Sequence, residues 1–300
     1  MTTVLEEAGE ERAGRNGGPT GLITDVIEFS AVDGPGNRFV IFTQGCNLNC
    51  IACHNPYTIN PCIDCGDCVV SCPSGALSLD AAGSVLWDAA SCTGGDTCID
   101  VCKYDSTPKA RTLAVADLIA RIRPAAPFLS GVTVSGGEAT QQAGFVRALF
   151  TALKADTELA RLTCFVDTNG DTDAATWQLL SPVMDAAMVD LKCLDDAIHR
   201  RMTGSGNERI LASIQLLAAA GRLHEVRLLL LPGVNDADDL LAETARWLAA
   251  VDPRMRIKVI GFRHHGVRPT AIPLREPSAE QRARYADILR AGGDFDLAVV

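Results

Sequence analysis

The chain has 300 residues, of which 47% are hydrophobic, so it can bury a sizeable core and is not disordered as a whole. Its formal net charge of -10 at pH 7 excludes a general affinity for nucleic acid or anionic membrane, because both need clustered Lys and Arg. The acidic start has no apolar signal segment, and no apolar run approaches the roughly 18 residues of a membrane span. We therefore expect a cytoplasmic protein, in which the twelve cysteines serve to bind metal rather than to form disulfides.

Strand-like and helix-like segments alternate after this start. Residues 1–20 lack apolar periodicity and are predicted to form a flexible tail. Apolar residues at i, i+3, i+4 and i+7 predict helices over residues 115–122 and 146–153, and Asn207 is a suitable N-cap for a third. The acidic residues 236–239 favour a fourth helix start. Strands are expected in the runs LITDVIEF, RFVIFTQG, GVTVSGG, LTCFVDTNG, AAMVDLK, HEVRLLLLPG, RIKVIGF and DFDLAVV.

This alternation predicts a parallel sheet with helices outside it. About six strand-helix units fit the length, fewer than the eight of a closed barrel, so we expect an α/β fold with an open or partial barrel. The cysteine-rich stretch between the second and third strands breaks the pattern and indicates a small inserted domain held by metal. The expected domains are the tail (1–20), a discontinuous barrel (21–56 and 108–300) and the insert (57–107).

Three cysteines, Cys46, Cys50 and Cys53, follow the strand RFVIFTQG on one short loop. Three thiolates can ligate three irons of a [4Fe-4S] cubane and leave the fourth iron open to a substrate. A zinc loop is the alternative for such a group. Two further cysteines, Cys164 and Cys193, stand alone in or just after strands and are expected to be small buried hydrophobes.

The insert carries the other seven cysteines in two groups. The first group precedes Pro73 with the spacing of bacterial ferredoxins, for which a zinc ribbon is the alternative. Its members are Cys62, Cys65, Cys68 and Cys72. In the second group, Cys92, Cys98 and Cys102, a glycine (Gly95) stands where another thiolate belongs.

Crossed ligation of the ferredoxin type would give one complete cluster and one incomplete cluster. The complete one would have the ligands Cys62, Cys65, Cys68 and Cys102. The other would have only Cys72, Cys92 and Cys98. Asp96, next to the gap, could supply an oxygen ligand; otherwise the cluster could be three-iron or labile.

Polar residues and glycines end several predicted strands, where a barrel places its chemistry. Gly136 and Gly137 allow a ligand to approach the backbone closely, and the carboxylate of Glu138 beside exposed carbonyls suits an ammonium group. The next strand ends present Asp167, Thr168, Asp190 and Lys192. His264 and His265 follow the strand RIKVIGF, and of these His265 is the candidate functional residue, with a solvated surface histidine as the alternative.

Taken in order, these segments resemble the glycyl-radical-enzyme activating enzymes of the radical S-adenosylmethionine (SAM) superfamily, and within them the YjjW-type activases. The resemblance runs from about Leu22 to His265. The segments that carry it are SAVDGPGNR, QGCNLNCIACHNP, the ferredoxin-like insert, VSGGEAT, DTNG, DLK, VRLLLLPG and GFRHHGV. It implies a partial (β/α)6 radical SAM barrel with an inserted ferredoxin-like iron-sulfur domain.

The resemblance also implies an activity. A [4Fe-4S] cluster on Cys46, Cys50 and Cys53 would cleave SAM reductively, and the 5′-deoxyadenosyl radical would take hydrogen from a glycine of a partner enzyme. Flavodoxin or ferredoxin would supply the electron through one or two auxiliary iron-sulfur clusters in the insert. The alternatives are a radical SAM enzyme acting on a small molecule or peptide and, in a different class, a non-enzymatic electron-transfer or zinc-binding protein.

Site residues follow from the resemblance position by position. The residues expected to contact SAM are Gly136, Gly137, Thr168, Lys192 and His265. Those expected to meet the glycine-bearing loop of the partner are Asp33, His54 and Arg227. Those expected to hold a monovalent cation near SAM are Asp167, Thr168, Met188 and Asp190. Two positions depart from the pattern, namely Ala52, where many relatives have an aromatic residue, and Gly95.

Overall fold

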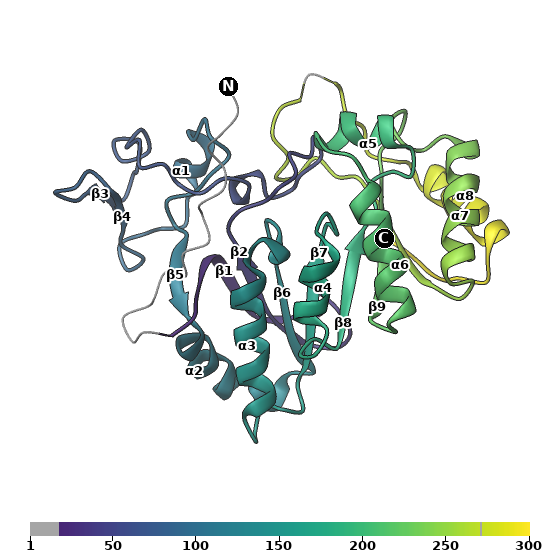
Figure 1. Cartoon of the computed structure of the whole chain (residues 1–300). Coiled ribbons are helices and arrows are strands. Elements are labelled where there is room, and N and C mark those ends of the chain that lie inside the picture. The colour runs from purple at the N-terminus through teal and green to yellow at the C-terminus, as the bar shows by residue number, and fades with distance from the viewer. Residues whose placement is uncertain (1–17, 271) are drawn as a thin grey trace, which may run out of the picture.

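A computed structural model describes residues 18–270 and 272–300 (Figure 1). Residues 1–17 of the predicted tail lie outside the described residues, and the first strand begins at Thr20, two residues earlier than expected. Within the described ranges no helix is long and apolar enough to cross a membrane.

The centre of the molecule is an open, nine-stranded sheet that contains all eight strands expected from the sequence. Its strands, in spatial order, are β11 (Asp296–Val299), β10 (Arg256–Gly261), β9 (Leu223–Leu230), β8 (Ala186–Asp190), β7 (Thr163–Thr168), β6 (Gly131–Gly136), β2 (Arg38–Thr43), β1 (Thr20–Ser30) and β5 (Arg111–Ala114). Seven of them, β2 and β6 to β11, run parallel, one more than the roughly six strand-helix units estimated from the length. β1 is antiparallel to both of its neighbours.

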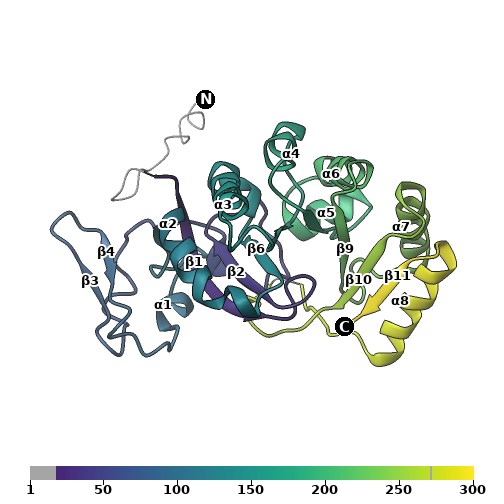
Figure 2. The ribbon, with the colours of Figure 1, turned by 90° about the horizontal axis from the view of Figure 1, so that it is seen from below.

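Helices connect the parallel strands and pack outside the sheet (Figure 2). They are α2 (Val115–Ala125), α3 (Ala143–Ala155), α4 (Ala174–Leu180), α5 (Asp196–Thr203), α6 (Glu208–Ala219), α7 (Asp238–Val251) and α8 (Ala279–Gly292), with 3-10 turns η1 (Pro56–Thr58), η2 (Ala126–Phe128) and η3 (Ala139–Gln142). The four predicted helices are confirmed as α2, α3, α6 and α7. The side chain of Asn207 precedes α6 as expected, but it donates to the carbonyls of Cys193 and Leu194 instead of capping the helix.

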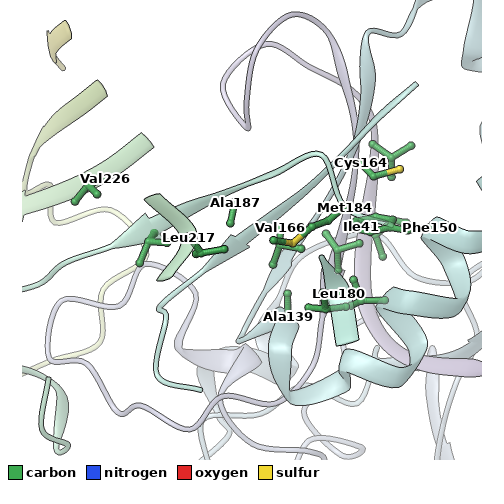
Figure 3. Packing of buried hydrophobic residues seen from close by; sticks show 14 of the residues in the cluster. Ile41, Ala139, Phe150, Cys164, Val166, Leu180, Met184, Ala187, Leu217 and Val226 are labelled. Atoms are coloured by element: carbon green, nitrogen blue, oxygen red, sulfur yellow. The ribbon is translucent and has the colours of Figure 1, made fainter. Parts of the chain in front are cut away.

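Buried aliphatic and aromatic residues fill the space between the sheet and the helices. Figure 3 shows Phe150 and Leu180 from α3 and α4 packed near Val166 of β7. The prediction for the two isolated cysteines is confirmed, since Cys164 is 0% and Cys193 is 6% exposed. This core holds the parallel strands in register, and therefore brings their carboxyl ends to one edge.

The cysteine-rich segment between β2 and β5 lies beside the sheet rather than within it (Figure 1). It contains a hairpin of β3 (Leu77–Leu79) and β4 (Val85–Trp87) and the four-residue helix α1 (Thr97–Asp100). A small apolar cluster of its own includes Cys68, Leu77 and Cys98. None of the twelve cysteines forms a disulfide.

Arg38, at the start of β2, is completely buried beneath the sheet. Its guanidinium donates to Thr133 Oγ1 (3.0 Å), to Val132 O (2.7 Å) and to Thr163 O (3.1 Å), and it lies over the ring of Phe165. Burial lowers the pKa of Arg38 to about 10, so it remains charged at neutral pH. One side chain therefore ties three neighbouring strands together at the edge opposite their carboxyl ends.

We expect Arg38→Met to lower the free energy of unfolding by about 2 to 4 kcal/mol, because buried carbonyl acceptors of β6 and β7 lose their donor. Urea denaturation followed by circular dichroism measures the change. Arg121→Met is the matched control, since Arg121 forms only an exposed ion pair with Glu28 and should cost less than about 1 kcal/mol. Equal effects of the two substitutions would contradict the structural role of Arg38.

Candidate functional site

The loop after β2, residues 44–55, carries Cys46, Cys50 and Cys53 and is here called the cysteine loop. Backbone hydrogen bonds fasten it to the turn that follows it, from Cys46 N to Ile59 O (2.9 Å), and to a distant helix, from Ile51 N to Met202 O (2.8 Å). The acceptor of the second bond, Met202 O, lies in the last turn of α5, a helix that the sequence did not predict. The cysteine loop is thus held from both sides at the carboxyl edge of the sheet.

A cavity of about 360 Å³, here called the central cavity, opens between the cysteine loop and the ends of the parallel strands. The structure brings most of the predicted site residues together around it. They are Asp33, Cys46, Cys50, Cys53, His54, Gly136, Gly137, Asp167, Thr168, Asp190, Lys192 and Arg227. Ala52 also lines this cavity, and so do Ser135 and Asn169, which the sequence did not single out.

The donor set of the central cavity fits an iron-sulfur cluster with one open coordination position. Burial raises the pKa of Cys46 to about 12 and that of Cys50 to about 11, so metal binding there must release protons. Among the described residues, no group of three His, Cys, Asp or Glu side chains is gathered closely enough for a single metal ion. A cubane spreads its irons over separate corners, so three thiols that surround a cavity suit it.

Glycine is needed at both positions at the end of β6, because the backbone of β2 and of the cysteine loop comes very close there. A Cβ atom on Gly136, whose φ is +120°, would lie 2.2 Å from Thr43 N, and one on Gly137 would lie 2.3 Å from Gly45 O. Both residues also line the central cavity. Their lack of side chains lets β6 and the cysteine loop meet, and leaves main-chain atoms at the cavity wall.

The placement of Glu138 differs from its predicted role as a partner for an ammonium group. Its carboxylate is buried, is not part of the cavity lining, and accepts hydrogen bonds from Thr140 N (2.9 Å), Thr168 Oγ1 (2.7 Å) and Asn169 N (2.7 Å). Burial raises the pKa of Glu138, against the hydrogen bonds that lower it. Its backbone N–H donates to Gly45 O (2.7 Å). Glu138 therefore joins the ends of β6 and β7 to the cysteine loop.

Lys192 extends from the end of β8 into the central cavity and forms an ion pair with Asp190 (Nζ to Oδ2, 2.8 Å). Burial by itself would lower the pKa of Lys192, but the nearby Asp190 carboxylate and the thiols of Cys50 and Cys53 raise it. The ammonium group therefore stays charged beside the cysteines. It can receive a carboxylate from a bound ligand.

Arg227 lines the central cavity and also binds several protein neighbours, and its contact with a partner stays a prediction. Its guanidinium contacts Asp167 Oδ1 (2.8 Å), Glu225 Oε1 (2.8 Å) and Met188 Sδ (3.0 Å). Burial by itself would lower the pKa of Arg227, but Asp167, Asp190 and Glu225 raise it. The sequence held one signal for this network, since Glu225 and Arg227 are charged residues two apart in an otherwise apolar strand, on the same face.

Three of the four predicted cation ligands, Asp167, Met188 and Asp190, already contact cationic side chains, whereas Thr168 donates to Glu138. Asp167 binds Arg227 and accepts from Ser135 Oγ (2.9 Å), and Asp190 binds Lys192. The side chain of Met188 is fully buried. A monovalent cation at Asp167, Thr168, Met188 and Asp190 stays a prediction.

The two histidines predicted for the site, His54 and His265, have different surroundings. His54 lines the central cavity, where its ring stacks on Phe262 and its Nε2 lies 2.9 Å from Arg263 O. His265 is exposed and lines a second, larger cavity beside the insert, and it is not part of the central lining. The predicted contact between His265 and SAM therefore has no support in the lining of the central cavity.

Arg268 is a residue of this site that the sequence reasoning missed. Its guanidinium binds Asp105 at the end of the insert and the side chain of Asn49, and it donates to Cys50 O (3.3 Å). A single side chain thus connects the C-terminal part of the chain, the insert and the cysteine loop. Its only signal in the sequence is its position three residues after His265.

Comparison with known protein families gives a match to the radical SAM superfamily over residues 40–246, about two thirds of the chain. The matched residues include the cysteine loop and the ends of β2, β6, β7, β8 and β9, but not Asp33 after β1 or the end of β10. QueE from Escherichia coli shares the fold, with a TM-score of 0.55 and 15% identity, over 94% of each chain. These likenesses show an α/β radical SAM fold with a largely parallel sheet.

Curated relatives narrow the assignment. The (2S)-3-sulfopropanediol sulfolyase activating enzyme of Bilophila wadsworthia is 32% identical over 73% of this chain and 78% of its own. The isethionate sulfite-lyase activating enzyme of Desulfovibrio desulfuricans is 29% identical over 82% and 84%, and the indoleacetate decarboxylase activating enzyme of Tractidigestivibacter scatoligenes is 30% identical over 91% and 95%. The chain belongs to the radical SAM superfamily and, within it, to the activating enzymes of glycyl radical enzymes.

Proposed function

We propose that the protein installs a radical on a glycine of a partner glycyl radical enzyme. The observation that carries the proposal is the gathering of Cys46, Cys50 and Cys53 with Lys192 and two glycines around one cavity, in a chain whose relatives are named as activating enzymes. The cluster and SAM, when bound there, supply the 5′-deoxyadenosyl radical that removes a hydrogen atom from the glycine.

Different residues of the chain bind the cluster, SAM and the partner's glycine segment. Cys46, Cys50 and Cys53 hold three irons of the [4Fe-4S] cluster, which leaves one iron for SAM. Lys192 faces the carboxylate of the methionine part of SAM, and the main chain at Gly136 and Gly137 accepts its amino group. Thr168 and Asn169 complete the polar wall, while Asp33 and His54 meet the partner's glycine segment.

We further propose that residues 57–107 form a ferredoxin-like insert with auxiliary clusters. Two small cavities support this, and their linings follow the crossed ligation pattern. One is lined by Cys62, Cys65, Cys68 and Cys102, and the other by Cys72, Cys92, Gly95 and Asp96. Cys98 lines both. Flavodoxin or ferredoxin is the proposed reductant, with the insert as the path for its electron.

Replacing Cys46, Cys50 and Cys53 together by Ala should abolish reductive cleavage of SAM while iron remains in the insert. The measurement is 5′-deoxyadenosine formed after anaerobic dithionite reduction, together with iron content. Cys164→Ala is the matched control, because this fully buried thiol lies within the core. Cleavage at the wild-type rate in the triple variant would refute the radical SAM assignment of these cysteines.

Asp33 and Arg227 should respond differently to substitution. Asp33→Asn should reduce formation of the glycyl radical about tenfold, the effect of one lost charged hydrogen bond to the partner, with a smaller effect on uncoupled SAM cleavage. Arg227→Gln should lower both activities, because it releases Asp167 at the cavity wall. Electron paramagnetic resonance measures the radical, and chromatography measures 5′-deoxyadenosine. Equal losses of both activities in Asp33→Asn would place Asp33 at SAM instead.

Iron content tests whether the missing thiolate ligand at Gly95 leaves one cluster incomplete. The wild type should hold fewer than the roughly twelve irons of three cubanes, or show a three-iron signal after mild oxidation. Gly95→Cys should raise the iron content, and the site has room, since a Cβ on Gly95 meets no atom within 4 Å.

Asp96 is the candidate fourth ligand, although Lys109 already binds its carboxylate. If Asp96 fills the gap, Asp96→Ala should lose one iron from the insert and leave the central cluster intact. Asp100→Ala, at the end of the short helix that Asp96 precedes, is the control and should lose none. About twelve irons in both the wild type and Asp96→Ala would show that another group completes the cluster.

A further inference from the structure

A cavity of about 1010 Å³, larger than the central cavity, lies between the insert and the segment that follows β10. We call it the lateral groove. One wall comes from the insert and is acidic, with Asp96, Asp100 and Asp105. The opposite wall, residues 263–269, is basic, with Arg263 and Arg268. The groove therefore presents opposite charges on its two sides, of which only Asp105 and Arg268 are paired across it.

The lateral groove adjoins the central cavity. His54 and Asn55 line both, so one end of the groove lies at the end of the cysteine loop. A Cβ on Gly266 would lie 2.5 Å from His54 O, which shows how closely the basic wall approaches this junction. A molecule in the groove would therefore reach the place where the radical chemistry begins.

Ser106 supplies a second, independent sign that the groove binds something. It lines the groove and also the adjacent small cavity of Cys62 and Cys102, it is only 2% exposed, and its Oγ has no hydrogen-bond partner among the described residues. A buried hydroxyl without a partner costs about 1 to 3 kcal/mol, and a bound molecule can offset that cost with one hydrogen bond. A polypeptide main chain offers both a donor and an acceptor at every residue.

We propose that the lateral groove receives the glycine-bearing segment of the partner enzyme as an extended chain, so that the iron-sulfur insert forms one wall of the substrate entrance. This inference rests on the proposed function. The groove's volume is at the upper limit of the roughly 300 to 1,000 Å³ typical of small-ligand sites, which suits a peptide segment. Its two charged walls would select the flanking side chains of that segment.

The test uses a purified glycyl radical enzyme that the wild-type protein activates, and a synthetic peptide of about 20 residues centred on its radical glycine. Asp100→Lys and Arg263→Glu each reverse one charge of the groove, and each should raise the KM for the peptide at least about fivefold. Uncoupled SAM cleavage and iron content should stay at the wild-type level. Asp287→Lys is the control, because Asp287 is exposed on α8, lies outside the linings of the groove and of the cluster cavities, and pairs with Arg290.

Ser106→Ala separates binding from folding. Loss of an unpartnered hydroxyl should leave the melting temperature unchanged or raised, while the KM for the peptide should rise about three- to tenfold. A benzoylphenylalanine in place of Asp100 should crosslink to the peptide on irradiation.

The outcomes distinguish the two proposals. Failure of the wild type to form a glycyl radical in any such enzyme would overturn the proposed function, and the groove with it. Normal activation by the wild type, with unchanged KM in all three variants and no crosslink, would overturn the groove alone. The groove proposal would also be overturned if a small molecule bound in the groove competed with SAM but not with the peptide.

Discussion

The carboxylate of Glu138 is the interaction on which the site depends. It is buried at the end of β6 and receives hydrogen bonds from the end of β7, while its backbone N–H reaches the cysteine loop. Since a buried carboxylate is stable only when its oxygens are satisfied, these three segments must meet in one arrangement. The cavity walls at Gly136, Gly137 and Thr168 are consequences of that arrangement.

The charged side chains around the central cavity are likewise paired with partners. Lys192 pairs with Asp190 at the end of the same strand, β8, whereas Arg227 of β9 pairs with Asp167 at the end of β7. Because parallel strands end at one edge, side chains far apart in the sequence come within hydrogen-bond distance. The cavity is therefore polar without an isolated buried charge, and both cationic groups are held in fixed positions before a ligand arrives.

Most of the sheet could be predicted from the sequence because its strands are short apolar runs that end in glycine or polar residues. All eight expected strands exist, and the polar ends of β6, β7 and β8 do meet around one cavity. Side-chain direction could not be predicted. The side chain of Glu138 points into the protein, and Arg227 forms ion pairs with Asp167 and Glu225. These directions depend on partners that come largely from other strands, which the local sequence does not show.

Helices α4, α5 and α8 were missed for a related reason: at least half of the residues in each are exposed, so the apolar spacing in the sequence is weak. The ninth strand, β5, was also missed, because its four residues gain their strand form only by pairing with β1.

Arg268 has a consequence for the order in which the protein matures. It holds Asn49 and the carbonyl of Cys50, which lies 218 residues earlier in the chain. At translation rates of about 5 to 20 residues per second, the cysteine loop emerges roughly ten to forty-five seconds before the arginine that fastens it. The insert, which Arg268 also binds through Asp105, is likewise complete long before this contact forms. The ligands of the cysteine loop are thus synthesised before the arginine that fastens this loop, so this contact can form only after residue 268 has been made.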